Sequence, residues 1–442
     1  MPENKKSWKE KQKERQTKDN KSQKAYQTRR EIESNKKPRK WPKGKIIAAV
    51  FVIILVLGIF AVWHFTTRPF TKIYIRADGS VDPSTAPISN VENSYYKFTA
   101  DISGSIVVEK DNVIIDGNRY FLQGHNETGS TGIYLGGRSN VTITRIKLNG
   151  FGYGVFLNLT NNSVISENEL TNNYSICFDT CSNNIVRENN ITISQGAILL
   201  AKSPYNNITE NSIDNNMYGI NLDYLSNSNI IFSNNITLSD GAILLSNFSS
   251  NNTIFGNRIE DNMSGITGDQ YSSGNIISGN NITNNDGAIG LSYSSNNSIT
   301  ENQINNNQGG IGLVGANFNI ISGNNMTNNE IAIGLSSSAN NSITENQINN
   351  NYYGINLNIS SGNTIVHNSF VDNSQEVVSI GSLNSWDDGY PSGGNYWSEY
   401  QAINPEAEEI DDSGIWNTPY VIDDNNQDNY PVVEDQFQLE SQ

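Results

Sequence analysis

Three glutamates occupy equivalent positions in successive repeats of this sequence, each directly before an asparagine: Glu167, Glu188 and Glu210. If the repeats stack, these carboxylates lie in register about 4.8 Å apart. Such a stack can recruit a cation, and its spacing is close to the roughly 5–5.5 Å between the two carboxylates of a retaining glycosidase. Arg187 adjoins Glu188 and offers a neutralising partner. A structural role, a cation site and a catalytic site therefore all remain open for the three glutamates.

The C-terminal segment holds a second group of candidates. Aromatic residues next to Asn and Asp suit stacking on neutral sugars. Four of the five aromatic residues in NSWDDGYPSGGNYWSEY are the candidates for this role: Trp386, Tyr390, Tyr396 and Trp397. An oxygen-rich run suited to Ca²⁺, although without the full spacing of an EF-hand, contains three aspartates: Asp423, Asp424 and Asp428. The same segment equally suits a cap over the open end of a repeat array. Apart from Ca²⁺, no cofactor is expected.

Soft metal ligands are few and scattered. The two cysteines, Cys177 and Cys181, are four residues apart at a predicted strand end and corner, where a disulfide is possible in an oxidising compartment. The histidines and three of the methionines share no register that would gather them: His64, His125, His367, Met217, Met263 and Met326. A copper site requires such ligands to cluster, so the sequence does not predict one.

A repeat of 21–23 residues must position these side chains. Its phrase is Ile-x-x-Asn-x-Ile followed by Gly/Ala-Ile-x-Leu, and residues 275–318 and 319–362 are nearly the same text. Self-similarity at this period predicts a solenoid in which each unit stacks on the next. The repeated asparagines are Asn168, Asn189, Asn211, Asn234, Asn257, Asn280, Asn302, Asn324, Asn346 and Asn368, with Asn118 upstream.

Short alternating segments show that the solenoid consists of strands. Isolated Ile-x-Leu segments between Asn, Ser and Gly predict three short strands per unit, with side chains such as Ile165, Leu170, Ile176 and Phe178 turned inward. The repeated Asn suits a corner, because it tolerates the left-handed backbone region, and stacked amides can bond as a ladder. We therefore predict an all-β, right-handed parallel β-helix of about 12 coils.

The N-terminal region predicts a membrane anchor. Residues 1–45 contain 17 Lys or Arg and 6 Asp or Glu, without hydrophobic periodicity, and are expected to be a disordered cytoplasmic tail. Residues 46–66 begin with an apolar run long enough to cross a bilayer. A cleavable signal peptide is the alternative, but no clear small-x-small cleavage site follows Ala61. We expect a single-pass protein of the cell membrane whose remaining residues lie outside the cell.

Beyond this tail we expect three further parts: an N-terminal β cap (67–111), the β-helix repeats (112–373) and an acidic, aromatic-rich C-terminal cap (374–442). After residue 45 there are 12 Lys or Arg and 39 Asp or Glu, a formal charge of −27, and no basic residue follows Arg258. Such a surface repels nucleic acid, so nucleic acid is not an expected partner. A polysaccharide lyase, which would use basic groups against a uronate, is also not expected.

The repeats and the terminal motifs together resemble a known family. The Asn-Asn-x-Ile-x-x-Asn-x-Ile coils are similar to those of NosD-type proteins, often described as periplasmic copper-binding proteins, and of carbohydrate-binding and sugar-hydrolase β-helix domains. IYIRADGSVDPSTAPIS near the start, with NSWDDGYPSGGNYWSEY and TPYVIDDNNQDNYPV near the end, resembles membrane-anchored archaeal surface members. The resemblance covers residues 72–433 and implies a right-handed β-helix at the cell surface. Its copper description implies metal delivery to a reductase.

From these observations we expect a non-enzymatic surface protein that acts in adhesion, envelope structure or recognition of neutral glycans. Two alternatives remain. One is a glycoside hydrolase that uses Glu167, Glu188 or Glu210, and the other is a copper-handling accessory protein.

Overall fold

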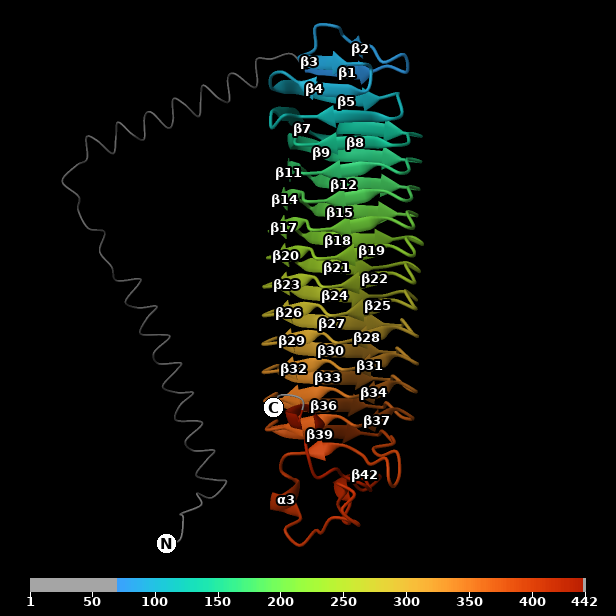
Figure 1. Ribbon diagram of the computed structural model, residues 1–442, viewed down its shortest axis with the longest axis vertical. Helices are drawn as coiled ribbons and strands as arrows, with labels where there is room; N and C mark the ends of the chain where they lie inside the picture. Colours follow the sequence, from blue (N-terminus) through green and yellow to red (C-terminus); the bar gives the residue numbers. More distant parts are fainter. Residues whose placement is uncertain (1–69, 440–442) are drawn as a thin grey trace, which may run out of the picture. The chain divides into compact units, whose positions relative to one another are not determined.

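A computed structural model describes residues 70–439, which form a parallel β-helix of the right-handed type (Figure 1). Each turn, here called a coil, contributes three strands that form three faces. One coil consists of β10 (Val164–Ser166), β11 (Glu169–Thr171) and β12 (Tyr174–Asp179), and β13 (Ile185–Arg187) begins the next coil. The predicted architecture is confirmed. The transmembrane prediction for residues 46–66 lies outside the described residues, and within 70–439 no helix is long and apolar enough to span a membrane.

The longest strands form the long-strand face, and 13 of them follow one another down the rod. The sequence predicted about 12 coils because the coil of β5 lacks the Asn phrase. The strands are β5 (Ile102–Val108), β7 (Phe121–Gly136), β9 (Lys147–Asn158), β12, β15 (Gly196–Ala201), β18 (Tyr218–Asp223), β21 (Gly241–Leu245), β24 (Ser264–Gly268), β27 (Gly287–Ser292), β30 (Gly309–Val314), β33 (Ile331–Ser336), β36 (Tyr353–Asn358) and β39 (Gln375–Ile380).

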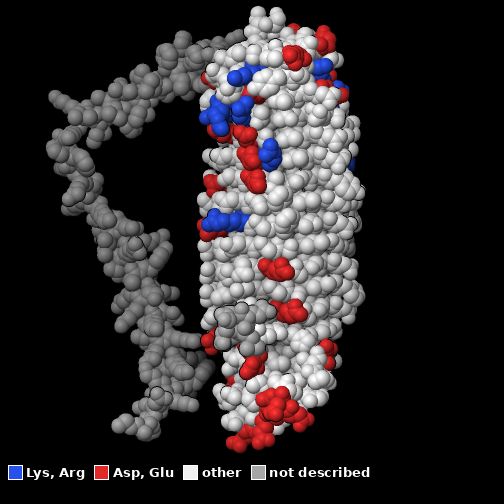
Figure 2. Space-filling view, viewed as in Figure 1, with Lys and Arg blue, Asp and Glu red and all other residues white. Residues whose placement is uncertain are grey.

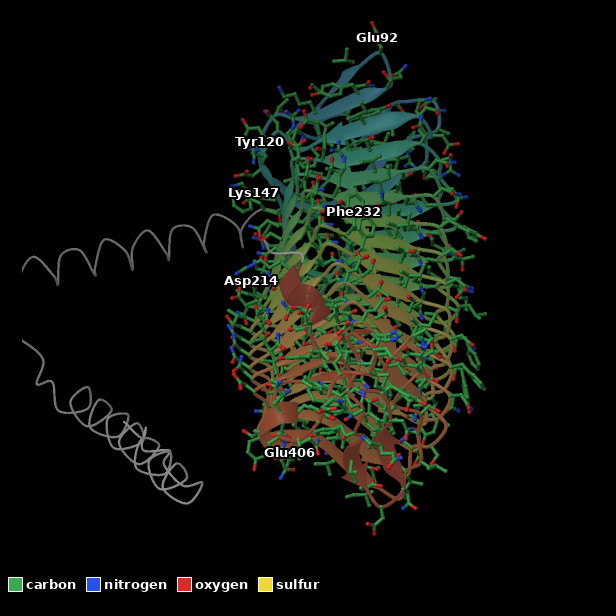
Figure 3. The ribbon with its side chains drawn as sticks, turned by 60° about the horizontal axis from the view of Figure 1, so that its bottom comes forward. Glu92, Tyr120, Lys147, Asp214, Phe232 and Glu406 are labelled. Atoms are coloured by element: carbon green, nitrogen blue, oxygen red, sulfur yellow. The ribbon has the colours of Figure 1, made fainter. Side chains whose placement is uncertain are left out.

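Three-residue strands, with two-residue β40 last, form the short-strand face, and β7 and β9 begin on it before they enter the long-strand face. Their outward side chains project into solvent, as Lys147 and Asp214 do in Figure 3. The strands are β11, β14 (Asn190–Thr192), β17 (Ser212–Asp214), β20 (Asn235–Thr237), β23 (Arg258–Glu260), β26 (Asn281–Thr283), β29 (Gln303–Asn305), β32 (Asn325–Thr327), β35 (Gln347–Asn349), β38 (Ser369–Val371) and β40 (Tyr396–Trp397).

The third face is a separate sheet of 14 strands, parallel except where β3 meets β4. The strands are β3 (Ile88–Val91), β4 (Tyr95–Phe98), β6 (Val113–Asp116), β8 (Val141–Thr144), β10, β13, β16 (Asn207–Thr209), β19 (Ile230–Phe232), β22 (Thr253–Phe255), β25 (Ile276–Ser278), β28 (Ser298–Thr300), β31 (Ile320–Ser322), β34 (Ser342–Thr344) and β37 (Thr364–Val366). The ends add β1 (Thr71–Ile75), β2 (Val81–Asp82), α3 (Tyr400–Ile403), β41 (Tyr420–Asp423), β42 (Asn426–Asp428) and α4 (Gln436–Leu439).

One aliphatic core fills the rod, because equivalent residues stack in register from coil to coil. Ile165 pairs with Val186, and Ile176 with Ile198, and all four side chains are buried. A fully buried aliphatic side chain stabilises the fold by roughly 1.5–3 kcal/mol. Because each coil buries its apolar residues largely against its neighbours, stability comes from stacking.

The repeated asparagines form a ladder inside the rod, and their role differs from the prediction in one respect. They are buried and lack a positive φ from Asn168 onward. The left-handed residue is the exposed one before each, such as Glu188 (φ 54°). Each amide bonds to the next coil, as Asn257 Nδ2 does to Asn280 Oδ1 at 3.0 Å. The residue that adopts the left-handed corner conformation is therefore the one before the Asn. The Asn side chain instead forms hydrogen bonds with buried backbone groups.

Two further asparagine ladders run parallel to this one. The second extends from Asn184 to Asn384, and the third is continuous from Asn262 to Asn373. A row of hydroxyls follows the long strands, where Cys181 N donates to Ser203 Oγ and Ser203 N to Ser226 Oγ. The corners are thus held by repeating polar contacts, while the strands between them bury the aliphatics.

Candidate functional site

The three stacked glutamates lie in register, as predicted, at exposed left-handed corners. Glu167 N donates to Arg187 O, and Glu188 N donates to Thr209 O. Arg187 Nη1 lies 3.0 Å from Glu188 Oε1, so the middle carboxylate is neutralised by the partner the sequence indicated. The following coils place Ser233, Gly256 and Gly279 in this row. The three glutamates are therefore a short acidic stretch in a row of structural corners, and the middle one, Glu188, forms an ion pair with Arg187.

The disulfide that the sequence allowed between Cys177 and Cys181 is not formed, and both side chains are buried free thiols. Cys177 is in register with Phe156 and Leu199, on the outer side of the long strands between inward Ile176 and Phe178. Cys181 instead occupies the hydroxyl row, where its Sγ donates to Asp179 O and accepts from Thr160 N. The left-handed corner at Thr180 (φ 58°), beyond the end of β12, turns Cys181 into the core, whereas Cys177 points outward. Burial raises the pKa of Cys177 to about 12 and of Cys181 to about 11, which keeps both protonated.

Two of the four predicted sugar-stacking rings are enclosed in the C-terminal cap. Trp397 stacks between Phe370 and Tyr420, with centroids 4.4 and 4.1 Å away, and Trp386 packs beside it. Both indoles are 1% exposed, so they present no face to a ligand. Tyr396 is half-buried and Tyr390 is 48% exposed. The cap interpretation of the segment is the one its geometry supports, because these rings close the end of the core.

The three predicted Ca²⁺ ligands face different surroundings. Asp428 is fully buried and accepts from Asn395 N, Trp397 Nε1 and Tyr430 N at 2.7–3.1 Å. Asp423 accepts from Asn425 N and Asn426 Nδ2, and Asp424 is exposed. Within residues 70–439, no three His, Cys, Asp or Glu side chains form a group that could hold a metal ion. Asp428 and Asp423 instead hold the cap together.

Burial in the same cap gives Glu376 an unusual protonation state, which the sequence did not reveal. Glu376 lies in register with Gly354, in a row where preceding coils carry small residues, and its side chain is 6% exposed. Desolvation raises its pKa to about 7, with nearby Glu399 adding to the effect, while Asn373 Nδ2 donates to it at 2.6 Å. The folded protein therefore holds a proton here at pH values where the unfolded chain has released it.

We predict that Glu376→Gln reduces the pH dependence of stability. Folding raises the pKa of the Glu376 carboxyl from 4.5 to about 7. Its contribution to the free energy of unfolding is therefore fully present below pH 4.5 and is lost as pH rises through 7. The loss is about 3 kcal/mol. In urea unfolding from pH 4.5 to 8, the stability of Glu376→Gln relative to wild type should increase as pH rises. Glu345→Gln, at an exposed position, is the control. Parallel curves for wild type and Glu376→Gln would contradict the assignment.

A copper centre does not fit the described residues. His125 approaches Ser103 Oγ near the N-terminal end, whereas His367 approaches Ser392 O near the C-terminal end. Met217 and Met263 share one corner row, contrary to the prediction, but they are two coils apart, roughly 9–10 Å. Met326 is in the core. These ligands are too dispersed to surround one ion.

An exposed aromatic ridge, which the sequence analysis missed, lines one edge of the long-strand face. We define it as Leu225, Phe248, Tyr271 and Tyr293, one residue from each of four successive coils. They are 53–62% exposed and all have a positive φ. The rings of Phe248 and Tyr271 stack with centroids 5.7 Å apart, at 18°. The sequence signal was the spacing of 23, 23 and 22 residues between large apolar side chains at positions expected to be polar turns.

At the last coil of the ridge and the coil after it, the long-strand face has little side-chain cover. β27 and β30 place Gly287, Gly290, Gly309 and Gly312, here called the glycine strip, at outward positions, with Ser292 and Val314 at the strand ends. A Cβ added at any of these glycines would meet nothing closer than 3.7 Å. The opposite edge carries Asp286 and Glu330, which lie in one row two coils apart. An extended ligand could therefore lie on the strip, between the aromatic edge and an edge of oxygen acceptors.

Charge is distributed unevenly over the rod. Figure 2 shows basic and acidic side chains together near the N-terminal end, only acidic ones toward the C-terminal end, and a broad region between with few charges. No Lys or Arg follows Arg258, so the glycine strip and the later coils have no cation of their own. The arrangement suits a neutral, hydroxyl-rich ligand and disfavours a polyanion.

The sequence profile of the family described as "Periplasmic copper-binding protein (NosD)" matches residues 89–267 and 239–402 of this chain. No curated protein sequence gives a significant match.

Three solved structures illustrate the similarity of the fold. DFA-IIIase from Arthrobacter chlorophenolicus has 12% identity and a TM-score of 0.42, covering 50% of this chain and 68% of its own. A mutant of the periplasmic alginate epimerase AlgG has 17% identity and a TM-score of 0.45, covering 67% and 78%. Dettilon tailspike protein has 17% identity and a TM-score of 0.43, covering 63% and 58%. Similarity at this level says nothing about what this chain binds.

Proposed function

This chain belongs to the NosD family, and from that premise we propose that it works outside the cytoplasm as a non-catalytic module that binds neutral glycans along its long-strand face. The family description is consistent with a location beyond the cytoplasmic membrane. The apolar run Ile46–Phe65, outside the described residues, would anchor it there by one span.

The aromatic ridge beside the glycine strip is the observation that carries the proposal. Large rings in the left-handed region are uncommon because most side chains are strained there. Here Leu225, Phe248 and Tyr271 adopt the left-handed conformation in three successive coils, and Tyr293 adopts it in the next one. They contribute little to the core, since more than half of each side chain is exposed. Aromatic faces supply a large contact area to a ligand, and the glycines let that ligand approach the sheet.

A catalytic role has weaker support. The stacked glutamates lie at exposed corners, and Glu188 is already paired with Arg187. None of them lies on the long-strand face, where the ridge and the glycine strip would hold a substrate. Adhesion or envelope structure is compatible with the proposal, since binding a neighbouring glycan is one way to perform either.

The test is a panel of neutral and acidic polysaccharides incubated with the full-length protein, with bound protein and released sugar measured together. We expect saturable retention on a neutral glycan, no release, and little retention on uronate polymers. Release that Glu188→Gln abolished would replace the proposal with a hydrolase. Equal retention on neutral and acidic polymers would contradict the charge argument.

A further inference from the structure

The β-helix departs from its repeat most clearly in β7, and the departure builds a pocket. β7 has 16 residues, and its register with β9 shifts twice, between Gln123 and Glu127 and again between Glu127 and Thr131. The extra residues leave the wall of the rod as a loop, here called the β7 loop (124–130). Its first and last residues remain close to β9, so the loop overhangs the junction of the short-strand and long-strand faces.

Glycines allow the β7 loop to lie directly against the next coil. A Cβ at Gly124 would be 2.1 Å from Gly150 O, and one at Gly152 would be 2.6 Å from Gly129 N. Ser130 Oγ donates to Glu127 O at 2.6 Å and accepts from Gly152 N at 3.1 Å. The loop is thus held in place by backbone packing and by one hydroxyl.

Beneath the loop is a pocket of about 400 Å³, within the size range of small-molecule sites. Asn126, Glu127 and Thr128 line it from the β7 loop, while Asn173 and Gln195 line it from the second and third coils after β7. No hydrogen bond to another described residue engages the side chains of Asn126, Glu127, Asn173 or Gln195. Amide, carboxylate and hydroxyl groups therefore face the pocket with unused hydrogen-bonding capacity.

The apolar part of the lining is small and specific. Phe151 forms a buried floor, at 2% exposure. Ile193 stands at the rim with 66% exposure and a φ of 54°, an unusual backbone region for a β-branched residue. In this row the later coils mostly carry Asn or Asp, such as Asn215 and Asp261. The pocket thus combines one accessible apolar side chain, Ile193, with several polar groups.

We propose that this pocket binds a single neutral sugar residue, the end of the glycan chain that lies on the long-strand face. This inference rests on the proposed function. A sugar ring offers hydroxyls to the amides and a C–H face to Ile193, while Phe151 closes the pocket from the core side. Glu127 is the one charged residue of the lining. Its carboxylate accepts hydrogen bonds from sugar hydroxyls and repels a uronate. Gln195 begins the corner row that continues to Asp286 and Glu330, so pocket and face share an edge.

The experiment compares the full-length protein with Asn173→Ala/Gln195→Ala in binding short neutral oligosaccharides and long polymers of the same sugar. Gln303→Ala is the control, because Gln303 is an exposed glutamine on β29 of the short-strand face, outside both the pocket and the long-strand face. We expect the double variant to lose at least tenfold in affinity for the oligosaccharide, whereas Gln303→Ala changes it less than twofold. The polymer should be retained, because it also contacts the ridge.

The outcomes separate the pocket from the face. Unchanged oligosaccharide affinity in the double variant, with polymer binding intact, overturns the pocket and leaves the proposed function standing. If wild type binds the oligosaccharide but not the polymer, and the double variant binds neither, the pocket is supported and binding along the long-strand face is overturned. Failure of wild type to bind either ligand overturns both.

Discussion

Replacing Asn280 with alanine should lower the free energy of unfolding by about 3–5 kcal/mol, because it leaves buried polar groups without partners. Asn280 Oδ1 accepts from Asn257 N and Nδ2, each at 3.0 Å, and Asn280 Nδ2 donates to Asn302 Oδ1 at 3.0 Å. It also donates to Ile254 O and Ser278 O. The residue is fully buried, so water does not replace these bonds.

Asn281→Ala is the matched control, since Asn281 is the next residue, points outward from β26 and is exposed. It should change stability by less than about 0.5 kcal/mol. Asn280→Asp keeps the shape but loses the donor group and places a carboxylate beside Asn302 Oδ1, so it should cost at least as much as alanine. The measurement is the urea midpoint of the three variants. Similar midpoints for Asn280→Ala and Asn281→Ala would show that the ladder contributes little.

The regular part of the fold is predictable because one short-range pattern recurs ten times. The period, the inward aliphatics such as Ile165 and Phe178, and the Asn ladder all follow from it and are confirmed. The error about the corner shows the limit of the pattern. Glu188 and Asn189 are adjacent, and the sequence does not distinguish which of them takes the left-handed conformation. Asn189 is inside because the backbone of two coils needs its amide.

The caps and the candidate site were less predictable because they depend on contacts that do not repeat. Trp386 and Trp397 are surrounded by Gly, Asp and Tyr in sequence and look exposed, yet Phe370 and Tyr420 enclose them from distant segments. The ridge escaped notice for the opposite reason. Phe248 and Tyr271 stand among Asn and Ser at turns, and only stacking of the coils brings them together.

The double substitution Phe248→Asn/Tyr271→Asn should weaken binding to a neutral polysaccharide at least tenfold, about 1.4 kcal/mol. Exposed aromatic side chains often carry most of the energy of a binding surface. Asn suits the left-handed backbone of both positions, φ 65° and 66°, as it does at Asn296 and Asn340. The variant therefore removes the rings and keeps the corners, so its unfolding midpoint should match that of wild type.

Phe255→Ser provides the matched control. Phe255 is also exposed, and it stacks on Phe232 with centroids 5.2 Å apart, but it lies on the 14-stranded sheet. Its loss removes an aromatic stack of the same kind from a different face. Binding should therefore remain within twofold of wild type.

The most direct test of glycan recognition by the long-strand face is the dissociation constant of one neutral polysaccharide for wild type, Phe248→Asn/Tyr271→Asn and Phe255→Ser. We predict a loss of at least tenfold in the ridge variant alone, with all three proteins equally stable. Equal affinity for all three, or an equal loss in both variants, would contradict it.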